Sequence, residues 1–136
     1  MDDKIRLDVV TPYGLILSED VDELTAAGSE GEFGVLPGHV PFITTLRTGM
    51  LIIKRDGKTE YVFVSSGYAE VTFNKVVVLA DSAERAEDID VERALAARKR
   101  AEERLQQAEK VDFARATAAI ERSTIRIQVA EKRSAK

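Results

Sequence analysis

The 136-residue sequence contains no cysteine and a single histidine, His39. Without cysteine there is no disulfide framework and no thiolate chemistry. One histidine excludes a histidine cage around a metal and leaves a Ser-His-Asp triad dependent on a single residue. No apolar run approaches the roughly 18 residues that a membrane span needs, and no basic, apolar signal segment is visible. We therefore expect a soluble, cytoplasmic chain that is not an enzyme and holds no metal.

Charge is distributed unevenly along the chain. Residues 1–88 carry 8 Lys and Arg against 16 Asp and Glu, a net charge of −8, whereas residues 89–136 carry 12 against 8, a net charge of +4. The acidic part argues against general nucleic-acid binding, and the basic part suits an acidic protein surface or phosphates. The composition also changes near Asp81, where alanine and charged residues replace β-branched ones. We predict two domains, 1–88 and 89–136.

Short segments of alternating apolar and polar residues fill the first domain. They cover residues 4–10, 15–17, 21–27, 40–45, 50–54, 59–65, 69–73 and 75–80. The dipeptide Asp56-Gly57 suits a tight hairpin with positive φ, and Ser66-Gly67 is expected to break the pairing. Residues 75–80 are apolar on both faces, which indicates a central strand. Eight or nine short strands with turns between them predict an antiparallel β-sandwich or a flattened barrel.

Residues 28–42 stand out as a loop rich in breakers. Four glycines and two prolines in fifteen residues exclude a regular helix. The apolar side chains between them are Phe33, Val35, Leu36, Val40 and Phe42. A solvated loop has no use for so many apolar groups, so we expect the loop to be pinned to the β core. It should present Glu30, Glu32 and His39 outward as a contact surface.

The second domain follows a helical period. Residues 90–109 predict one helix, and Asp112 is placed to cap a second across a turn at residues 109–111. The two predicted stripes consist of Val91, Ala94, Leu95, Arg98, Ala101, Leu105 and Ala108, and of Phe113, Ala116, Ile120, Ser123, Ile127 and Ala130. The fold class is thus β + α, with an antiparallel two-helix hairpin after the sandwich. Burying a large aliphatic side chain stabilises a fold by ~1.5–3 kcal/mol, and burying an alanine methyl stabilises it far less. The hairpin should therefore be held marginally and be easy to shift.

Four runs and the hairpin carry a family resemblance. The runs are residues 7–12 (LDVVTP), 28–39 (GSEGEFGVLPGH), 64–68 (VSSGY) and 79–85 (LADSAER). Nearly end to end, the chain resembles the epsilon subunit of bacterial F-type ATP synthases. The resemblance implies a noncatalytic central-stalk subunit of the rotor that helps to couple proton flow to ATP synthesis. It also implies a peripheral location at the cytoplasmic face of the plasma membrane, reached only through the complex.

The resemblance further implies partners. The β domain would contact the gamma subunit and the c-ring, with Glu30 and Glu32 facing the c-ring and His39 lying toward gamma. The hairpin in this family folds against the sandwich or extends along gamma toward the catalytic beta subunits, which it contacts transiently and inhibits in ATP hydrolysis.

Some bacterial members bind a regulatory ATP through a motif of Ile or Leu followed by Asp-x-x-Arg-Ala, which residues 89–94 match. By this resemblance the candidate ATP-binding residues are Glu84, Ile89, Asp90, Arg93, Ala94, Arg100, Arg115, Arg122 and Arg126. The Asp90 carboxylate can accept from an adenine amine, and arginines supply forked donors for phosphate. No cofactor is required.

Simpler interpretations stay open. Asp90 can be a plain N-cap, and each arginine can be solvated helix surface paired with a glutamate three or four residues away. Glu30 and Glu32 can protect a sheet edge, and His39 can be a hydrogen-bonded structural residue. Two other functions compete: a stand-alone nucleotide-sensing adaptor, and a basic helical arm for nucleic acid. The second lacks aromatic residues for stacking on its basic faces.

Overall fold

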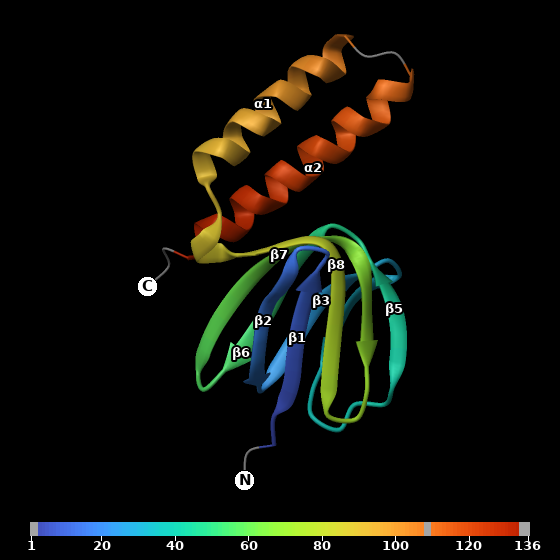
Figure 1. Cartoon of the computed structure of the whole chain (residues 1–136), viewed down its shortest axis with the longest axis vertical. Helices are drawn as coiled ribbons and strands as arrows, with labels where there is room; N and C mark the ends of the chain where they lie inside the picture. The colour runs from blue at the N-terminus through green and yellow to red at the C-terminus, as the bar shows by residue number, and fades with distance from the viewer. Residues whose placement is uncertain (1–2, 108–109, 134–136) are drawn as a thin grey trace. The chain divides into compact units, whose positions relative to one another are not determined.

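The computed structural model describes residues 3–107 and 110–133. The chain forms two compact units, Met1–Arg85 and Ala86–Lys136. In the described part of the chain, the regular elements of the first unit are all strands and those of the second are all helices (Figure 1). Among the described residues, no helix combines the length and apolar character that crossing a membrane requires.

The first unit is an eight-stranded β-sandwich, as the sequence predicts. Its strands are β1 (Ile5–Thr11), β2 (Gly14–Val21), β3 (Glu23–Gly28), β4 (Gly31–Val35), β5 (Phe42–Leu46), β6 (Gly49–Arg55), β7 (Lys58–Val71) and β8 (Lys75–Arg85). They follow the order β2-β1-β8-β7-β5-β3-β4, and β6 pairs with β3 and β7. One pair, β1 with β8, is parallel, and the other pairs are antiparallel.

The core lies on the inner faces of these strands. Ile5, Leu7 and Val9 of β1 are at most 1% exposed, as their alternation predicts. Strand β8 is central, between β1 and β7, which confirms its predicted place. Its inner face is buried, but Val77 and Leu79 on the outer face are only half-buried. The sandwich therefore leaves part of an apolar strand face accessible.

Strand β7 does not stop at the predicted break. Its register with β8 is unchanged from Val62 to Val71, so Ser66-Gly67 redirects the strand rather than ending it. The residues before this point pair with β6 and those after it with β5. Ser66 has φ 50° and Gly67 has φ 135°. A Cβ on Gly67 would lie 2.0 Å from the carbonyl oxygen of Leu79, so only glycine permits this approach of β7 to β8.

The glycine-rich segment is shorter as a loop than predicted. Residues 31–35 form β4 and pair with β3, so only the two-residue turn 29–30 and residues 36–41 lie outside strands. The expectation that apolar side chains pin the segment is confirmed for Val35, which is buried, and for Phe33 and Phe42, which pack on the core. It is wrong for the remaining two. Leu36 and Val40 are 57% and 71% exposed.

The Asp56-Gly57 hairpin is confirmed. Both residues have positive φ, 52° and 81°, and they join β6 to β7 in register. A two-residue hairpin of this kind matches the twist of its flanking strands.

The second unit is a helical hairpin. It comprises η1 (Ala86–Asp88), α1 (Val91–Gln107) and α2 (Lys110–Lys132), and the two long helices run antiparallel side by side (Figure 1). Its described buried residues are mostly small: Ala86, Ile89, Ala94, Ala101, Ala116, Ser123, Val129 and Ala130. Alanines allow the helices to approach closely and contribute little apolar area.

Several details of the predicted hairpin are wrong. Leu95 and Phe113 are 43% and 55% exposed, because small residues occupy the line of contact and displace the larger ones to its flanks. Helix α2 begins at Lys110, so Asp112 lies inside its first turn and not at its cap. Lys110 and Val111 likewise belong to the helix rather than to the turn. Ala108 and Glu109 lie outside the described residues.

Candidate functional site

Asp90 begins α1 as its N-cap. The backbone N–H of Arg93 donates to Asp90 Oδ1 at 3.0 Å, and the N–H of Ala94 donates to the Asp90 carbonyl at 3.0 Å. The simple capping interpretation is therefore confirmed. The cap uses one carboxylate oxygen of an exposed side chain, and a carboxylate offers about four acceptor positions. Capping thus leaves acceptor capacity for a ligand.

The other residues of the 89–94 motif are either buried in the hairpin or exposed at its surface. Ile89 and Ala94 are 3% and 4% exposed, so they hold the start of α1 in the hairpin interior. The Arg93 side chain is exposed. The motif therefore fixes its own backbone while it offers a carboxylate and a guanidinium to solvent.

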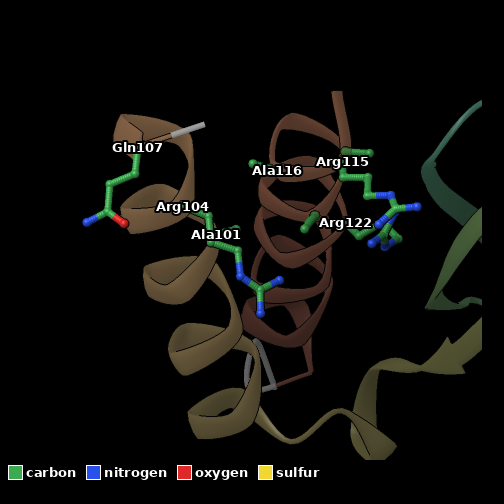
Figure 2. A pocket seen from close by; sticks show the side chains of 8 residues that line it. Ala101, Arg104, Gln107, Arg115, Ala116 and Arg122 are labelled. Carbon is green, nitrogen blue, oxygen red and sulfur yellow. The ribbon is translucent and has the colours of Figure 1, made fainter. Parts of the chain in front are cut away.

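A cavity of about 650 Å³ is lined by residues of both helices, nearer their connected ends (Figure 2). Its lining residues are Ala101, Arg104, Gln107, Arg115, Ala116, Ala118, Ala119 and Arg122. In this view the Arg115 and Arg122 side chains both extend to the side of α2 away from α1. That of Arg104 extends toward α2, whereas Gln107 points away. None of the lining residues described is acidic, so the site suits a phosphate or another anion.

The structure brings together only some of the predicted ATP residues. Arg115 and Arg122 line the cavity, whereas Arg93, Arg100 and Arg126 are not among its lining residues. Arg100 is exposed and Arg126 half-buried. From Asp90 to Ala101 the helix rises about 16 Å. The motif and the cavity therefore lie at separate positions along the hairpin.

Glu84 and Arg104 are the two residues at which the predicted set and the cavity differ further. Glu84 lies on β8, in the first unit, and is half-buried. Arg104 lines the cavity and is absent from the predicted set. Its position four residues after Arg100, on the same helical face, was the available signal.

The acidic turn and the histidine lie on the sandwich. Glu30 stands in the β3–β4 turn and Glu32 begins β4, and both are exposed. His39 is half-buried; its Nδ1–H donates to the Val40 carbonyl at 2.8 Å, and its ring centroid lies 5.2 Å from that of Phe42. A carbonyl can only accept, which fixes this nitrogen as the donor. His39 is thus a hydrogen-bonded structural residue at the surface.

An apolar outer face was missed by the sequence reasoning. Pairing aligns Leu15, Val10, Leu79 and Tyr68 in one row across β2, β1, β8 and β7. Leu15 is 62% exposed and Tyr68 is 45% exposed. A hollow of about 520 Å³ beside this row is lined by Val10, Thr11, Pro12, Gly67, Tyr68, Leu79, Ala80 and Asp81. The signal was the strand apolar on both faces, because only one of those faces turns toward the core. This apolar row is a candidate interaction surface.

Charged pairs fasten the edges of the sandwich. Glu19 is 14% exposed and lies 3.3 Å from Arg85 and 3.7 Å from Arg55; burial raises the pKa of the Glu19 carboxyl. Hydrogen bonds to Asp22 and Asp56 raise the pKa of Lys4 to about 12. In the part of the chain that the structure describes, no cluster of three or more His, Cys, Asp or Glu is placed to hold a metal.

Comparison with known proteins follows the same division. A family model described as the beta-sandwich domain of the ATP synthase delta/epsilon chain matches residues 4–86. A second, described as the long alpha-helix domain of that chain, matches residues 87–131. Together they cover nearly all of the sequence.

Individual relatives agree. An ATP synthase epsilon chain of Nitratidesulfovibrio vulgaris (strain DP4) is 59% identical over 79% of this chain and 80% of its own length. One of Thermodesulfovibrio yellowstonii is 54% identical over 79% of this chain and 76% of its own. A chain of the Euglena gracilis mitochondrial ATP synthase, solved as OSCP/F1/c-ring, superposes with a TM-score of 0.78 at 28% identity, covering 96% of this chain and 81% of that one.

A β-sandwich followed by a two-helix hairpin, with family matches over both, is the domain arrangement of the delta/epsilon chains of ATP synthases. The chain belongs to the ATP synthase delta/epsilon chain family, as an epsilon subunit of that membrane-associated enzyme complex.

Proposed function

We propose that this chain is a noncatalytic rotor subunit that joins gamma to the c-ring at the cytoplasmic face of the plasma membrane and so helps to couple proton flow to ATP synthesis. The observation that carries the proposal is the apolar row Leu15, Val10, Leu79 and Tyr68, because it gives a rigid sheet face that a partner subunit can cover.

In this proposal the sandwich uses two surfaces. Gamma covers the apolar row and the hollow beside it, and His39 lies toward gamma. Glu30 and Glu32 meet the polar loops of the c-ring from the β3–β4 turn, where the pairing of Gly28 with Gly31 holds them on a short hairpin. Exposed charges at such a rim set orientation and partner choice more than affinity.

Co-purification tests the stalk role. The chain is tagged in its own cells, membranes are solubilised gently, and the subunits recovered with it are identified. We expect alpha, beta, gamma and the c-ring from the wild type. The double variant Leu15→Glu/Tyr68→Glu, which places two charges on the apolar row, should lose most of them, whereas Lys58→Glu at the start of β7 should not. Recovery of the wild-type chain alone would contradict the proposal.

We also propose that the hairpin regulates ATP hydrolysis by binding ATP. The Asp90 carboxylate, with acceptor capacity left after capping, takes the adenine amine, and Arg115, Arg122 and Arg104 take the phosphates at the cavity. Ile89 and Ala94, which are buried, supply a fixed backbone, and the remaining candidates on the hairpin, Arg93, Arg100 and Arg126, contribute at the periphery. Bound nucleotide then favours the arrangement in which the hairpin is withdrawn from the beta subunits.

Calorimetric titration of the full chain with ATP tests this second part. Arg115→Ala and Arg122→Ala should each weaken binding about tenfold or more, since a hydrogen bond to a charged group contributes ~1.5–3 kcal/mol. Lys99→Ala, which removes a charge from the exposed face of α1, should change little. No heat at millimolar ATP would remove the nucleotide role and leave the stalk role standing.

A further inference from the structure

Arg133 ties the two ends of the hairpin together at its base. It follows the last residue of α2, and its Nη1 donates to the carbonyl oxygen of Ile89 at 2.9 Å and to that of Ala86 at 3.3 Å. A guanidinium Nη carries two N–H groups, so one nitrogen can serve both acceptors. The contact joins residues 44 and 47 positions apart in the sequence.

Both acceptors belong to the connector that leads into α1. The carbonyl of Ala86 also accepts the N–H of Ile89 at 3.3 Å, within the turn of η1, and the next residue, Asp90, caps the helix. Ala86 and Ile89 are each 3% exposed, and Val129 of α2 is fully buried. Arg133 therefore holds the segment whose conformation decides where α1 begins.

The weak packing of the hairpin interior makes the Arg133 contact a relatively large contribution to its stability. The described interior of the hairpin is built mainly from alanines, which bury little apolar area each. A charged donor to two carbonyls is among the stronger single interactions available to such a unit. A cation just beyond the end of α2 also complements the negative end of that helix.

We propose that Arg133 is a positioning residue: it clasps residues 86–89 to the end of α2 and thereby fixes Asp90 and the start of α1 for nucleotide binding. The clasp rests on the contacts above, and only its effect on ATP rests on the proposed function. When the clasp opens, the start of α1 loosens while the middle of the helix pair stays together. Arg133 itself need not touch the nucleotide.

Hydrogen exchange of the full chain, resolved by residue and measured without nucleotide, tests the clasp. In Arg133→Ala the amides of Ile89, Arg93 and Ala94 should exchange about tenfold faster or more than in the wild type. Those around Ala101 should change less than about twofold. Arg133→Lys, which keeps the charge on a differently shaped donor, should fall between, and Lys99→Ala should match the wild type. Unchanged exchange at the three amides in Arg133→Ala would overturn the clasp.

ATP titration of the same variants tests positioning. We expect Arg133→Ala to weaken ATP binding by about the factor by which exchange rises, with partial rescue in Arg133→Lys. Faster exchange with unaltered ATP affinity would overturn the positioning role. Absence of ATP binding by the wild type would instead refute the proposed nucleotide function, while the exchange comparison would still decide the clasp. If Arg133→Ala lost its helical circular dichroism, Arg133→Lys would carry both comparisons.

Discussion

At the scale of single residues, two strands approach so closely at one point that no side chain fits. Gly67 lies where β7 exchanges β6 for β5 as its partner, and the Leu79 carbonyl occupies the space of a Cβ. The same residue lines the hollow beside the apolar row. One glycine therefore affects both the stability of the sandwich and the shape of its proposed interface.

Gly67→Ala should be severely destabilising. The added Cβ would meet backbone atoms of Leu79 and Ala80, and φ 135° is a conformation that side-chain-bearing residues rarely adopt. We expect a loss of about 3 kcal/mol or more in the free energy of unfolding, measured by urea denaturation.

Gly34→Ala is the matched control for this prediction. Its Cβ would have one neighbour at an ordinary 3.8 Å. A loss of less than about 1 kcal/mol is expected there. Equal losses at both positions would show that the close approach of β7 to β8 at Gly67 does not cause the loss of stability.

Asp8 gives the sandwich a defined acid sensitivity. A hydrogen bond from the Ser18 hydroxyl, at 2.6 Å, and the nearby charges of Lys75 and Arg6 lower the pKa of its carboxyl. A lowered folded-state pKa means that the stabilisation is present above the unfolded-state value, about 4, and is lost as the pH falls through the folded-state value.

Asp8→Asn should remove this acid sensitivity. At pH 7 the wild type should be more stable than the variant by about 0.5 kcal/mol, since solvent screens these partly exposed pairs. The difference should shrink below pH 4. Thermal unfolding from pH 7 to pH 3 checks it, and a difference that grows on acidification would contradict the assignment.

At the scale of elements, the hairpin has a well-defined helix start but a weakly packed helix contact. Asp90 caps α1, and alanines line the helix contact. The cap and its ligand role involve the same carboxylate, so a simple deletion cannot separate them. A hydroxyl can cap a helix as well as a carboxylate does.

Asp90→Ser should separate capping from nucleotide binding. Serine preserves the N-cap, so helicity by circular dichroism should match the wild type, whereas Asp90→Ala should lose about 1 kcal/mol of stability. ATP binding should fall about tenfold or more in both variants, because both lose the charged acceptor. Full ATP affinity in Asp90→Ser would mean that Asp90 acts only as a cap.

Local rules predicted what depends on neighbours in sequence. The Asp56-Gly57 hairpin and the Asp90 cap follow from backbone preferences of a few residues, and β1 follows from its alternation. The parallel pairing of β1 with β8 joins residues about 70 apart, which no local pattern specifies. The exposure of Phe113 depends on how each helix is rotated against the other.

The candidate site shows the same limit. Asp90 and Arg115 could be named from the sequence because a family motif and its basic companions mark them. Arg104 enters the cavity, and Arg133 reaches the Ile89 carbonyl, only once the two helices are packed. The apolar row on the sandwich needs the strand register, because its members come from four strands.

At the scale of the whole molecule, the two units differ in how they are held. Among the residues whose burial is described, the largest fully buried side chains, including Phe63, Leu7 and Leu51, belong to the sandwich. The described hairpin interior contains mainly alanines. A firmly packed sandwich suits a fixed place in a stalk, and a weakly packed hairpin suits an element that changes position.

The central claim is that the hairpin is the movable, nucleotide-responsive part of an otherwise rigid subunit. Hydrogen exchange of the full chain, compared with and without ATP, measures this directly. We predict that amides of α1 and α2 exchange faster than those of β1, β7 and β8, and that ATP slows the helices and leaves the strands unchanged. Helices that exchange as slowly as the strands and do not respond to ATP would contradict the account.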